Sequence, residues 1–451
     1  MTRPAPFVSI LLAVATAAAS LAAWEEHRQL DALAPEARKS ALLSTENDAL
    51  RTALEAARQD AADARDTVRR AEIERVVTSL RQLPFKQPVE YAVLDHAGIR
   101  QVLAGKISET YSDQEIANAS TGLSAFGLLP PDYPLKQSYI DLLGEQVAAF
   151  YDQHQHKLFM FRGASLENSQ NRVILAHELT HALQDQNFGL MKLPLEIKNN
   201  DDEADAASAL IEGDATLVMS QYMAGDFSWR SLTDTVTYSA TQSMEQLRRA
   251  PHYLRRMLVF PYIDGQKFCA AVYERGGFAA LSAVYADPPS STAQILHPEK
   301  YFKETREDPI RVVFPDTTFQ GQKPLEDNVL GEMACQLLFA GADPNGADQI
   351  AAGWRGDRYL VFDGGKCLVW TSVWRSAEAA NAAAAAIDQV FTRRYHRNAA
   401  NAGPGPAWSL SQQPEPATSA ASPANEVVFI LGPGRESLQL LQQKFAGAAH
   451  G

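Results

Sequence analysis

One pentapeptide, residues 177–181 (HELTH), constrains the fold of this chain more than any other stretch. Residues four apart lie on the same face of an α-helix, so the imidazoles of His177 and His181 can point at a single cation. Residues 174–183 contain no charged side chain other than Glu178. We therefore expect a buried helix with a metal-binding face. The alternative is an ordinary buried helix whose two histidines are satisfied by hydrogen bonds.

The flanks of the pentapeptide support this helix, and Glu178 gives it a chemical role. Asn168 or Ser169 can cap the start of the helix, and Gly189 can end it. Glu178 follows the first histidine directly, about a quarter-turn round the helix, so it can lean over the same ion. A glutamate so placed takes a proton from water whose pKa bound zinc lowers to about 7. The pattern therefore predicts a Zn²⁺ site with Glu178 as catalytic base.

A second helix is expected from residue 201 to residue 219. It begins with acidic side chains, which suit the positive end of a helix dipole, and then becomes apolar. Glu212 lies in the apolar part, where a carboxylate is costly unless it is paired or binds a metal. Gly213, a poor helix former, would let a neighbouring backbone or the metal site approach closely.

The two segments together, HELTH and then Glu212-Gly-Asp-Ala, resemble the gluzincin zinc metallopeptidases. The resemblance implies that His177, His181 and Glu212 bind Zn²⁺, that the fold is a thermolysin-like zincin, and that the substrate is a peptide or protein. The wider setting is similar to a poorly characterised group of exported bacterial proteins with the same motif. That similarity rests on segments 145–152, 176–186 and 291–301, and covers roughly residues 85–310.

Two features depart from thermolysin-like enzymes. Thirty residues separate His181 from Glu212, which is more than in those enzymes. Thr216 stands where they carry an aspartate that orients a ligand histidine. Asp214 or Asp205 could take that orienting role, and the alternative for both is a solvated charge near a helix start.

Peptide hydrolysis also needs a donor for the developing oxyanion, usually a His or Tyr from a distant segment. His297 and Tyr301 are the candidates, because the resemblance includes their segment. The alternative for His297 is a structural role, capping a turn before Pro298.

Residues 157–162 (KLFMFR) have the composition of a β-strand just before the HELTH helix. Zincins place an edge strand over the active-site helix, where an extended peptide can add by backbone hydrogen bonds. We expect residues 157–162 to be that edge strand. His154 and His156, just before it, could bind metal, but exposed turn positions are the favoured interpretation.

Composition narrows the classes of partner. The net charge of −13 disfavours nucleic acid and anionic membrane surfaces, which repel an acidic protein. The three cysteines, Cys269, Cys335 and Cys367, are too few and scattered for a disulfide framework or a thiolate zinc site. One disulfide would still be compatible with this number, and three buried thiols are the favoured alternative.

The N-terminus reads as an export segment. Arg3 precedes an uncharged, mostly apolar run over residues 7–24, long enough either for a cleaved signal peptide or for a membrane anchor. In either case the body should lie outside the cytoplasm: secreted, in the periplasm, or anchored in the inner membrane and facing the periplasm.

Residues 25–83 predict a long helix with a heptad seam. From Leu43 the seam runs through residues 47, 50, 54, 57, 61, 64, 68 and 71, and Asn47 could set its register. A coiled-coil homodimer competes here with a helix that folds back on the body of the protein.

The C-terminal region predicts a small domain of β-β-α and β-α units. Strands are expected at residues 358–362, 366–374 and 426–431, and helices at residues 376–395 and 437–445. A linker rich in Pro, Ala and Ser would occupy residues 398–425. These units together suggest an open-faced sandwich.

We therefore expect an α+β, predominantly helical chain with four parts. They are a signal or anchor (1–24), a helical coiled-coil segment (25–83), a zincin-like domain (84–345) and a C-terminal domain (346–451). The expected function is that of an exported zinc metallopeptidase. The alternative is a coiled-coil envelope adaptor whose zincin-like domain is structural or only binds peptides.

Overall fold

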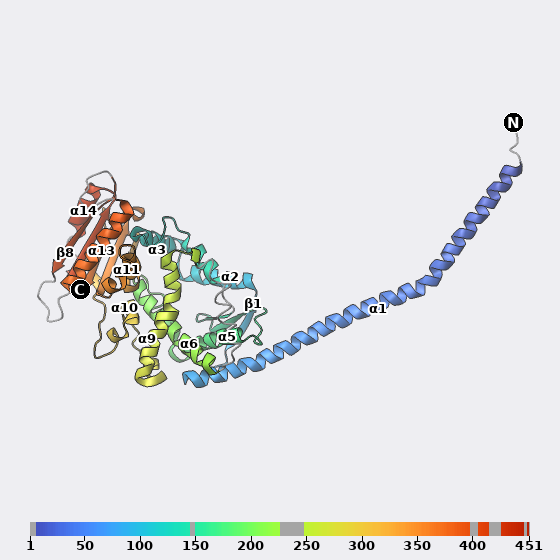
Figure 1. The fold of residues 1–451 in the computed structure, drawn as a ribbon, viewed down its shortest axis with the longest axis horizontal. Helices are drawn as coiled ribbons and strands as arrows, with labels where there is room; N and C mark the ends of the chain where they lie inside the picture. The colour runs from blue at the N-terminus through green and yellow to red at the C-terminus, as the bar shows by residue number, and fades with distance from the viewer. Residues whose placement is uncertain are drawn as a thin grey trace, which may run out of the picture. The chain divides into compact units, whose positions relative to one another are not determined.

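The computed structural model describes residues 6–144, 149–225, 248–396, 405–414, 425–445 and 449–450. They form two compact units, Met1–Arg69 and Arg70–Gly451 (Figure 1). The chain is a mixed, mostly helical α+β protein with a long N-terminal helix and a C-terminal antiparallel sheet, as expected from the sequence. Residues 145–148, part of the segment 145–152 named above, lie outside the described residues. So do residues 231–247, the first part of a stretch (231–260) whose pattern predicts one or two amphipathic helices.

Helix α1 (Pro6–Arg81) runs unbroken for 76 residues and joins the first two expected segments into one element. Its residues from 70 onward belong to the second unit, where Ile73, Val77 and Arg81 are buried. In the part of the chain that is described, no helix is both long and apolar enough to cross a membrane.

The first sheet has three strands, β1 (Glu90–Leu94), β2 (Ala149–Asp152) and β3 (Lys157–Phe161), in the order β1-β3-β2. β3 pairs in parallel with β1 and antiparallel with β2. The expectation of an edge strand at residues 157–162 was therefore wrong, because β1 occupies its second edge. The edge strands are β1 and β2. Between them in the chain lie α2 (His96–Thr110), α3 (Asp113–Phe126) and α4 (Leu135–Gly144).

Two helices of the second unit carry the two sequence motifs. α5 (Ser169–Phe188) starts where the Asn168 side chain accepts a hydrogen bond from the Gln170 N–H, and it ends at Gly189 in the left-handed region. The turn η1 (Leu190–Lys192) leads to α6 (Asp201–Gly225). Both expected helices are confirmed, and together they form the centre of the larger apolar core.

Helix α9 (His252–Val284) packs along α6. Its backbone leaves helical geometry at Gly276 and Gly277. Asp264-Gly265 is a dipeptide that favours a turn in the sequence, and this prediction is wrong, since both residues are helical and buried. Gly265 serves a close helix contact instead: a Cβ on it would stand 2.1 Å from the Ala209 carbonyl oxygen of α6.

The chain then passes through short elements to the C-terminal region. They are α10 (Thr292–Leu296), η2 (Pro298–Lys300), β4 (Val312–Val313), β5 (Glu326–Asn328), α11 (Gly331–Ala340) and α12 (Ala347–Ala351).

The C-terminal sheet is antiparallel, with five strands in the order β5-β6-β7-β9-β8. β6 (Trp354–Phe362) and β7 (Cys367–Trp374) flank the turn η3 (Asp363–Gly365) and precede α13 (Ala377–Tyr395). The last elements are β8 (Ala407–Pro414), β9 (Asn425–Gly432), α14 (Arg435–Phe445) and β10 (Ala449–His450), which pairs with β4.

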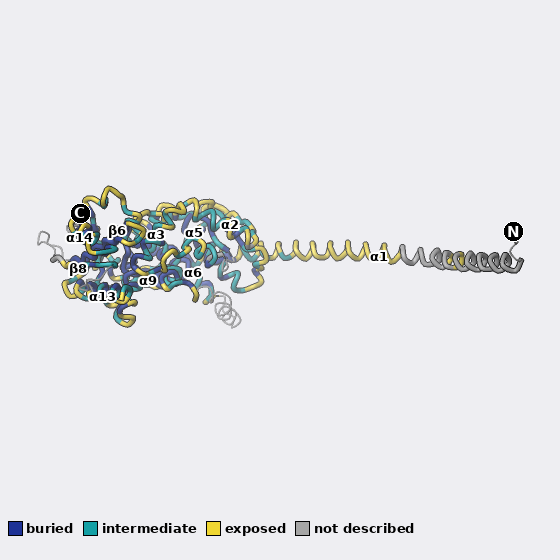
Figure 2. The backbone as a smooth tube through the Cα atoms, turned by 90° about the horizontal axis from the view of Figure 1, so that it is seen from above, coloured by how far each residue is buried: buried dark blue, intermediate teal, exposed yellow. Residues whose placement is uncertain are grey.

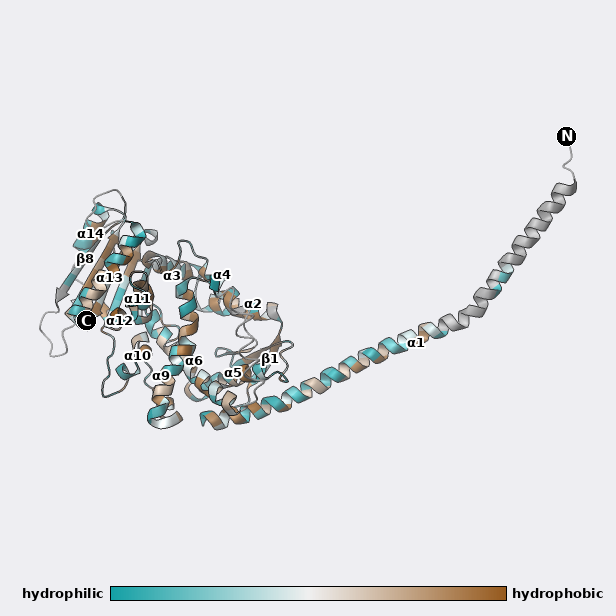
Figure 3. Cartoon of the chain, viewed as in Figure 1, coloured by the Kyte–Doolittle hydropathy of each residue, from teal (hydrophilic) through white to brown (hydrophobic). Residues whose placement is uncertain are grey.

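This sheet differs from the expected open-faced sandwich in two ways. Its alternating apolar residues, seen as hydrophobic strands in Figure 3, pack under α11 and α13 on one face and under α14 on the other. Strand β8 lies within the predicted linker 398–425. The linker residues 398–404 and 415–424, on either side of this strand, lie outside the described residues. The three cysteines are buried and free of disulfide bonds.

Candidate metal centre

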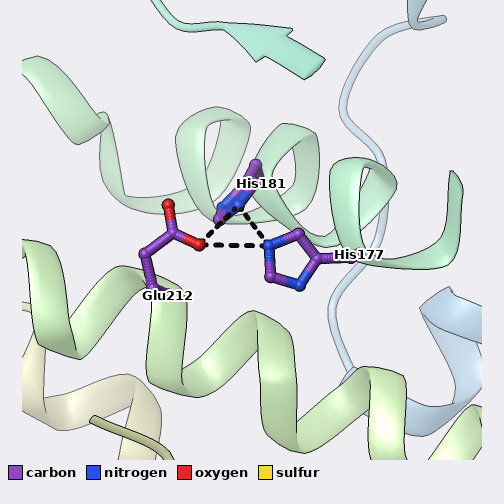
Figure 4. Close-up of side chains that lie close together, drawn as sticks. All are labelled: His177, His181 and Glu212. Carbon is purple, nitrogen blue, oxygen red and sulfur yellow. Dashed lines mark hydrogen bonds and ion pairs between the residues drawn. The ribbon is translucent and has the colours of Figure 1, made fainter. Parts of the chain in front are cut away.

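Helices α5 and α6 bring three side chains to one point. Figure 4 shows His177 and His181 projecting from α5 toward Glu212 on α6. His177 Nε2 lies 3.0 Å from His181 Nε2 and 3.1 Å from Glu212 Oε2, and His181 Nε2 lies 3.4 Å from the same oxygen. Both histidines are buried and Glu212 is half-buried. One ligand atom from each residue therefore faces a common centre that could hold a metal ion.

The tautomer of His181 is set by Gln184. The side-chain amide of Gln184 donates to the Ile211 carbonyl at 3.0 Å, which leaves its Oε1 to face His181 Nδ1 at 2.9 Å. In the neutral ring that a metal would require, His181 Nδ1 then carries the proton, which leaves the lone pair of Nε2 for the centre. Gln184 thus performs the orienting role that the sequence suggested for Asp214 or Asp205.

His177 is held mainly by ring contacts. Its ring meets His181 edge-on, with centroids 4.6 Å apart, and lies roughly parallel to the ring of Tyr262 at 5.9 Å. Its buried Nδ1 has no hydrogen-bond partner among the described residues.

Charge interactions within the group shift the protonation of its members. Burial raises the pKa of Glu212, but the adjacent His181 and His177 outweigh that effect and hold the pKa well below its usual value. Burial lowers the pKa of His181, and the carboxylate of Glu212 more than compensates, which raises it to about 9. In the absence of a cation, the group therefore stabilises itself as an ion pair between imidazolium and carboxylate.

Glu178 lies beside this group on α5. The backbone N–H of Tyr151, on edge strand β2, donates to Glu178 Oε2 at 2.8 Å. Burial raises the pKa of Glu178, and the two histidines oppose that rise. A carboxylate fixed by one hydrogen bond, with a raised pKa, has the properties of a general base.

Tyr262, on α9, completes the surroundings of the group and was not predicted from the sequence. The negative charge of Glu212, burial and the charge of Glu178 all raise the pKa of Tyr262. No fixed spacing links Tyr262 to the HELTH motif, so only the packing of α9 on α6 could reveal it.

A cavity of about 150 Å³ opens beside His181 and Glu212. Its walls combine apolar side chains with the polar groups of Gln153 and Ser208; the apolar contributors are Leu190, Leu195 and Ile211, with Tyr151 at the edge. The volume is comparable to that of a cavity that holds one benzene-sized group.

Asp214 is used in a second buried cluster rather than at the histidines. Arg81, in the last turn of α1, donates from Nε to Asp214 Oδ2 at 3.0 Å, and the hydroxyl of Tyr285 donates to the same oxygen at 2.8 Å. Arg81 and Asp214 are fully buried. This pair fastens the end of α1 to α6, two residues after Glu212.

Asp205, the other expected orienting residue, lies at the acidic start of α6. Burial and the charges of Asp201 and Asp202 raise its pKa well above the usual range.

The other predicted site residues have partners elsewhere. His297 Nε2 lies 2.6 Å from Glu332 Oε1 on α11, and the Tyr301 hydroxyl donates to the Asp287 carbonyl at 2.7 Å. No contact among the described residues links either side chain to the metal-binding group. His154 Nε2 lies 2.9 Å from Glu196 and His156 Nδ1 lies 2.7 Å from Asp185, so both occupy polar turn positions.

Comparison with known proteins adds one match. A family model described as a domain of unknown function (DUF8575) is similar to residues 318–442, the region of the C-terminal sheet. No curated protein and no solved structure matches the chain. Helices α5 and α6 lie outside the matched region, so the function has to be argued from the geometry of the site.

Proposed function

We propose that this chain is an exported zinc-dependent hydrolase of the zincin type, most specifically a metallopeptidase of the gluzincin kind. The observation that carries the proposal is the convergence of His177, His181 and Glu212 with Glu178 beside them. Export rests on the apolar run over residues 7–24 in the sequence.

The donor set fits zinc. Ligand atoms about 2.0–2.1 Å from a tetrahedral Zn²⁺ stand about 3.3 Å from one another. The separations of 3.0, 3.1 and 3.4 Å between the three ligand atoms bracket that value. Two imidazoles and one carboxylate form the ligand set of catalytic zinc sites that keep a fourth position open.

Bound zinc would supply Lewis acidity, polarising a carbonyl and lowering the pKa of a coordinated water. The protein's own residues would move the proton. Glu178, held by the Tyr151 N–H, takes a proton from the attacking water and delivers it to the leaving amine. Burial raises its pKa, which makes it a stronger base for the first of these transfers.

Tyr262 is the best-placed donor for the developing oxyanion. Its ring lies 5.9 Å from the ring of His177 and its hydroxyl feels the charges of Glu212 and Glu178, whereas His297 and Tyr301 are bound to Glu332 and Asp287. A donor aimed at the reacting carbonyl stabilises the transition state more than the substrate. We therefore assign this role to Tyr262 in place of the two residues suggested by the resemblance.

Strand β2 is the edge along which a peptide would lie. It forms one margin of its sheet, and its Tyr151 contacts Glu178. An extended peptide can add to such an edge through backbone hydrogen bonds. The adjoining cavity of about 150 Å³ would then accept one substrate side chain.

The competing function is that of an envelope adaptor with a structural or peptide-binding zincin-like domain. The long helix α1 favours it. A structural zinc site, however, needs no general base, and here a buried carboxylate is placed beside the ligands.

The test is the variant Glu178→Gln. Glutamine keeps the shape of the side chain and an oxygen that can accept the hydrogen bond from the Tyr151 N–H, but it cannot act as a base. We expect the variant to bind zinc as the wild type does and to lose about 10²–10⁴-fold in the hydrolysis rate of a quenched-fluorescence peptide library. Glu274→Gln, on the exposed side of α9, is the matched control and should keep full activity. Equal hydrolysis by wild type and Glu178→Gln would contradict the proposed base, and no hydrolysis by a zinc-loaded wild type would favour the adaptor.

A further inference from the structure

The helical seam of α1 is uncovered. Leu43, Leu50, Leu54 and Val68 are exposed by 55, 63, 50 and 70%, although they are the largest apolar residues of the seam. Every seam residue from Leu43 to Ala71 is exposed, as the yellow stretch of α1 shows in Figure 2. The seam ends just before Ile73 and Val77, which are buried in the second unit.

The spacing of the seam assigns heptad positions to α1. Steps of three and four place residues 47, 54, 61 and 68 at position a, and residues 43, 50, 57, 64 and 71 at position d. Asn47 is then a polar residue at an a position, which favours a fixed register and a two-stranded assembly. The small alanines at residues 57, 61 and 64 allow two helices to approach closely.

The flanking charges decide the orientation of the partner. Position e carries Arg51, Arg58 and Arg65, and position g carries Glu46 and Asp60. In a parallel pair, each g residue faces the e residue five positions later on the other helix. Glu46 then meets Arg51 of the second copy and Asp60 meets Arg65, and no like charges face each other at these positions.

An antiparallel pair would reverse this pattern. There, e faces e and g faces g, so arginine would face arginine along one flank and acid would face acid along the other. Like-charge contacts of this kind are unfavourable. The charges at positions e and g therefore favour a parallel pair of helices and disfavour an antiparallel pair.

We propose that residues 43–71 form a parallel, in-register, two-stranded coiled coil with a second copy of this chain. In this assembly the C-terminal ends of both α1 helices lie together, so residues 70–451 of the two copies follow the same end of the coiled coil. The proposal does not depend on the zinc chemistry.

Cysteine cross-linking tests the orientation on the full-length chain in a mild detergent. In a parallel, in-register dimer each core residue meets the same residue of the second copy. Leu50→Cys at position d and Val68→Cys at position a should therefore each form a disulfide between the two copies under mild oxidation. Gln59→Cys, exposed at the outer f position, is the matched control and should stay monomeric on a non-reducing gel. The native cysteines are buried, so they give no background.

Charge exchange tests the flanks. Light scattering at low salt should give the mass of two chains for the wild type. Glu46→Arg with Asp60→Arg should weaken dimerisation by about tenfold or more, because four attractive contacts become repulsive. Adding Arg51→Glu and Arg65→Glu to the same chain should restore the dimer, since every pair is again of opposite charge.

A monomeric wild type at tens of micromolar would overturn the proposal. So would a dimer in which neither Leu50→Cys nor Val68→Cys cross-links with itself, because that result indicates an antiparallel or unrelated interface. A mass of three chains would overturn the two-stranded assignment. Failure of the four-residue exchange to recover the dimer would contradict the assigned charge pairs.

Discussion

Gly213 and Gly265 bring two helices into direct backbone contact. A Cβ built on Gly213 of α6 would lie 2.2 Å from the carbonyl carbon and oxygen of Gly265 on α9. Gly213 follows Glu212 directly, and Gly265 lies three residues after Tyr262. This contact therefore limits how far apart the two helices can hold Glu212 and Tyr262.

Gly213→Ala should loosen this crossing. The added methyl has no space without moving α9, so we expect a loss of about 1–3 kcal/mol in the free energy of unfolding, measured by chemical denaturation. Gly225→Ala, in the last turn of the same helix, meets nothing within 4 Å and is the matched control. Its effect should be near zero or slightly stabilising, because alanine favours helix. Equal effects of the two substitutions would contradict the contact.

Tyr262→Phe should slow catalysis and leave the metal in place. Loss of one oxyanion donor costs about 10²–10³-fold in kcat. We expect a fall of this order with little change in KM and unchanged zinc content. Tyr301→Phe is the comparison, since its hydroxyl binds the Asp287 carbonyl. If Tyr301→Phe were the slower enzyme, the donor assigned from the sequence would be correct and Tyr262 would not.

Asp202 should make stability fall as pH rises. Burial raises its pKa from 3.8 to about 7, against hydrogen bonds from Thr292 that lower it. Between about pH 4 and pH 7 the folded chain thus holds a proton that the unfolded chain has released. Each such proton lowers the free energy of unfolding by about 1.4 kcal/mol per pH unit.

Asp202→Asn removes this titration and keeps an oxygen for the Thr292 hydroxyl and N–H. The free energy of unfolding is measured by urea denaturation at each pH. Between pH 4 and pH 7 we expect it to fall less steeply in the variant, by up to the slope that one proton contributes. Titrating groups away from this residue act equally on both proteins. The pKa of Asp205, which the charge of Asp202 raises, falls in the variant and changes the slope in the same direction, so the difference reports Asp202 together with this neighbour. An unchanged slope would contradict the raised pKa.

The sequence was sufficient for the local features of the site. Asn168 and Gly189 bound α5 as predicted, and the acidic start of α6 led to Glu212 in an apolar setting. These features depend on spacings within one helix, where a period of 3.6 residues fixes which side chains share a face.

The sequence was not sufficient where distant segments meet. β3 became a central strand because β1, more than sixty residues earlier, pairs with its free edge. Strand β8 of the C-terminal sheet lies in a stretch whose Pro, Ala and Ser content indicated a linker, and it forms by pairing with β9. Tyr262 lies beside the site through the packing of α9 on α6, which no short-range pattern encodes. Gln184 lies three residues after His181 on the same helix, but the Ile211 carbonyl that orients its amide comes from α6.

The central claim is that His177, His181 and Glu212 hold one zinc ion. Elemental analysis of the purified chain after dialysis against zinc, beside Glu212→Ala and Glu178→Gln, tests it most directly. We predict one zinc per chain in the wild type and in Glu178→Gln, whose substituted carboxylate is not a ligand, and little or none in Glu212→Ala. A wild type without zinc, or a Glu212→Ala variant that binds as much as the wild type, would contradict the three-ligand site.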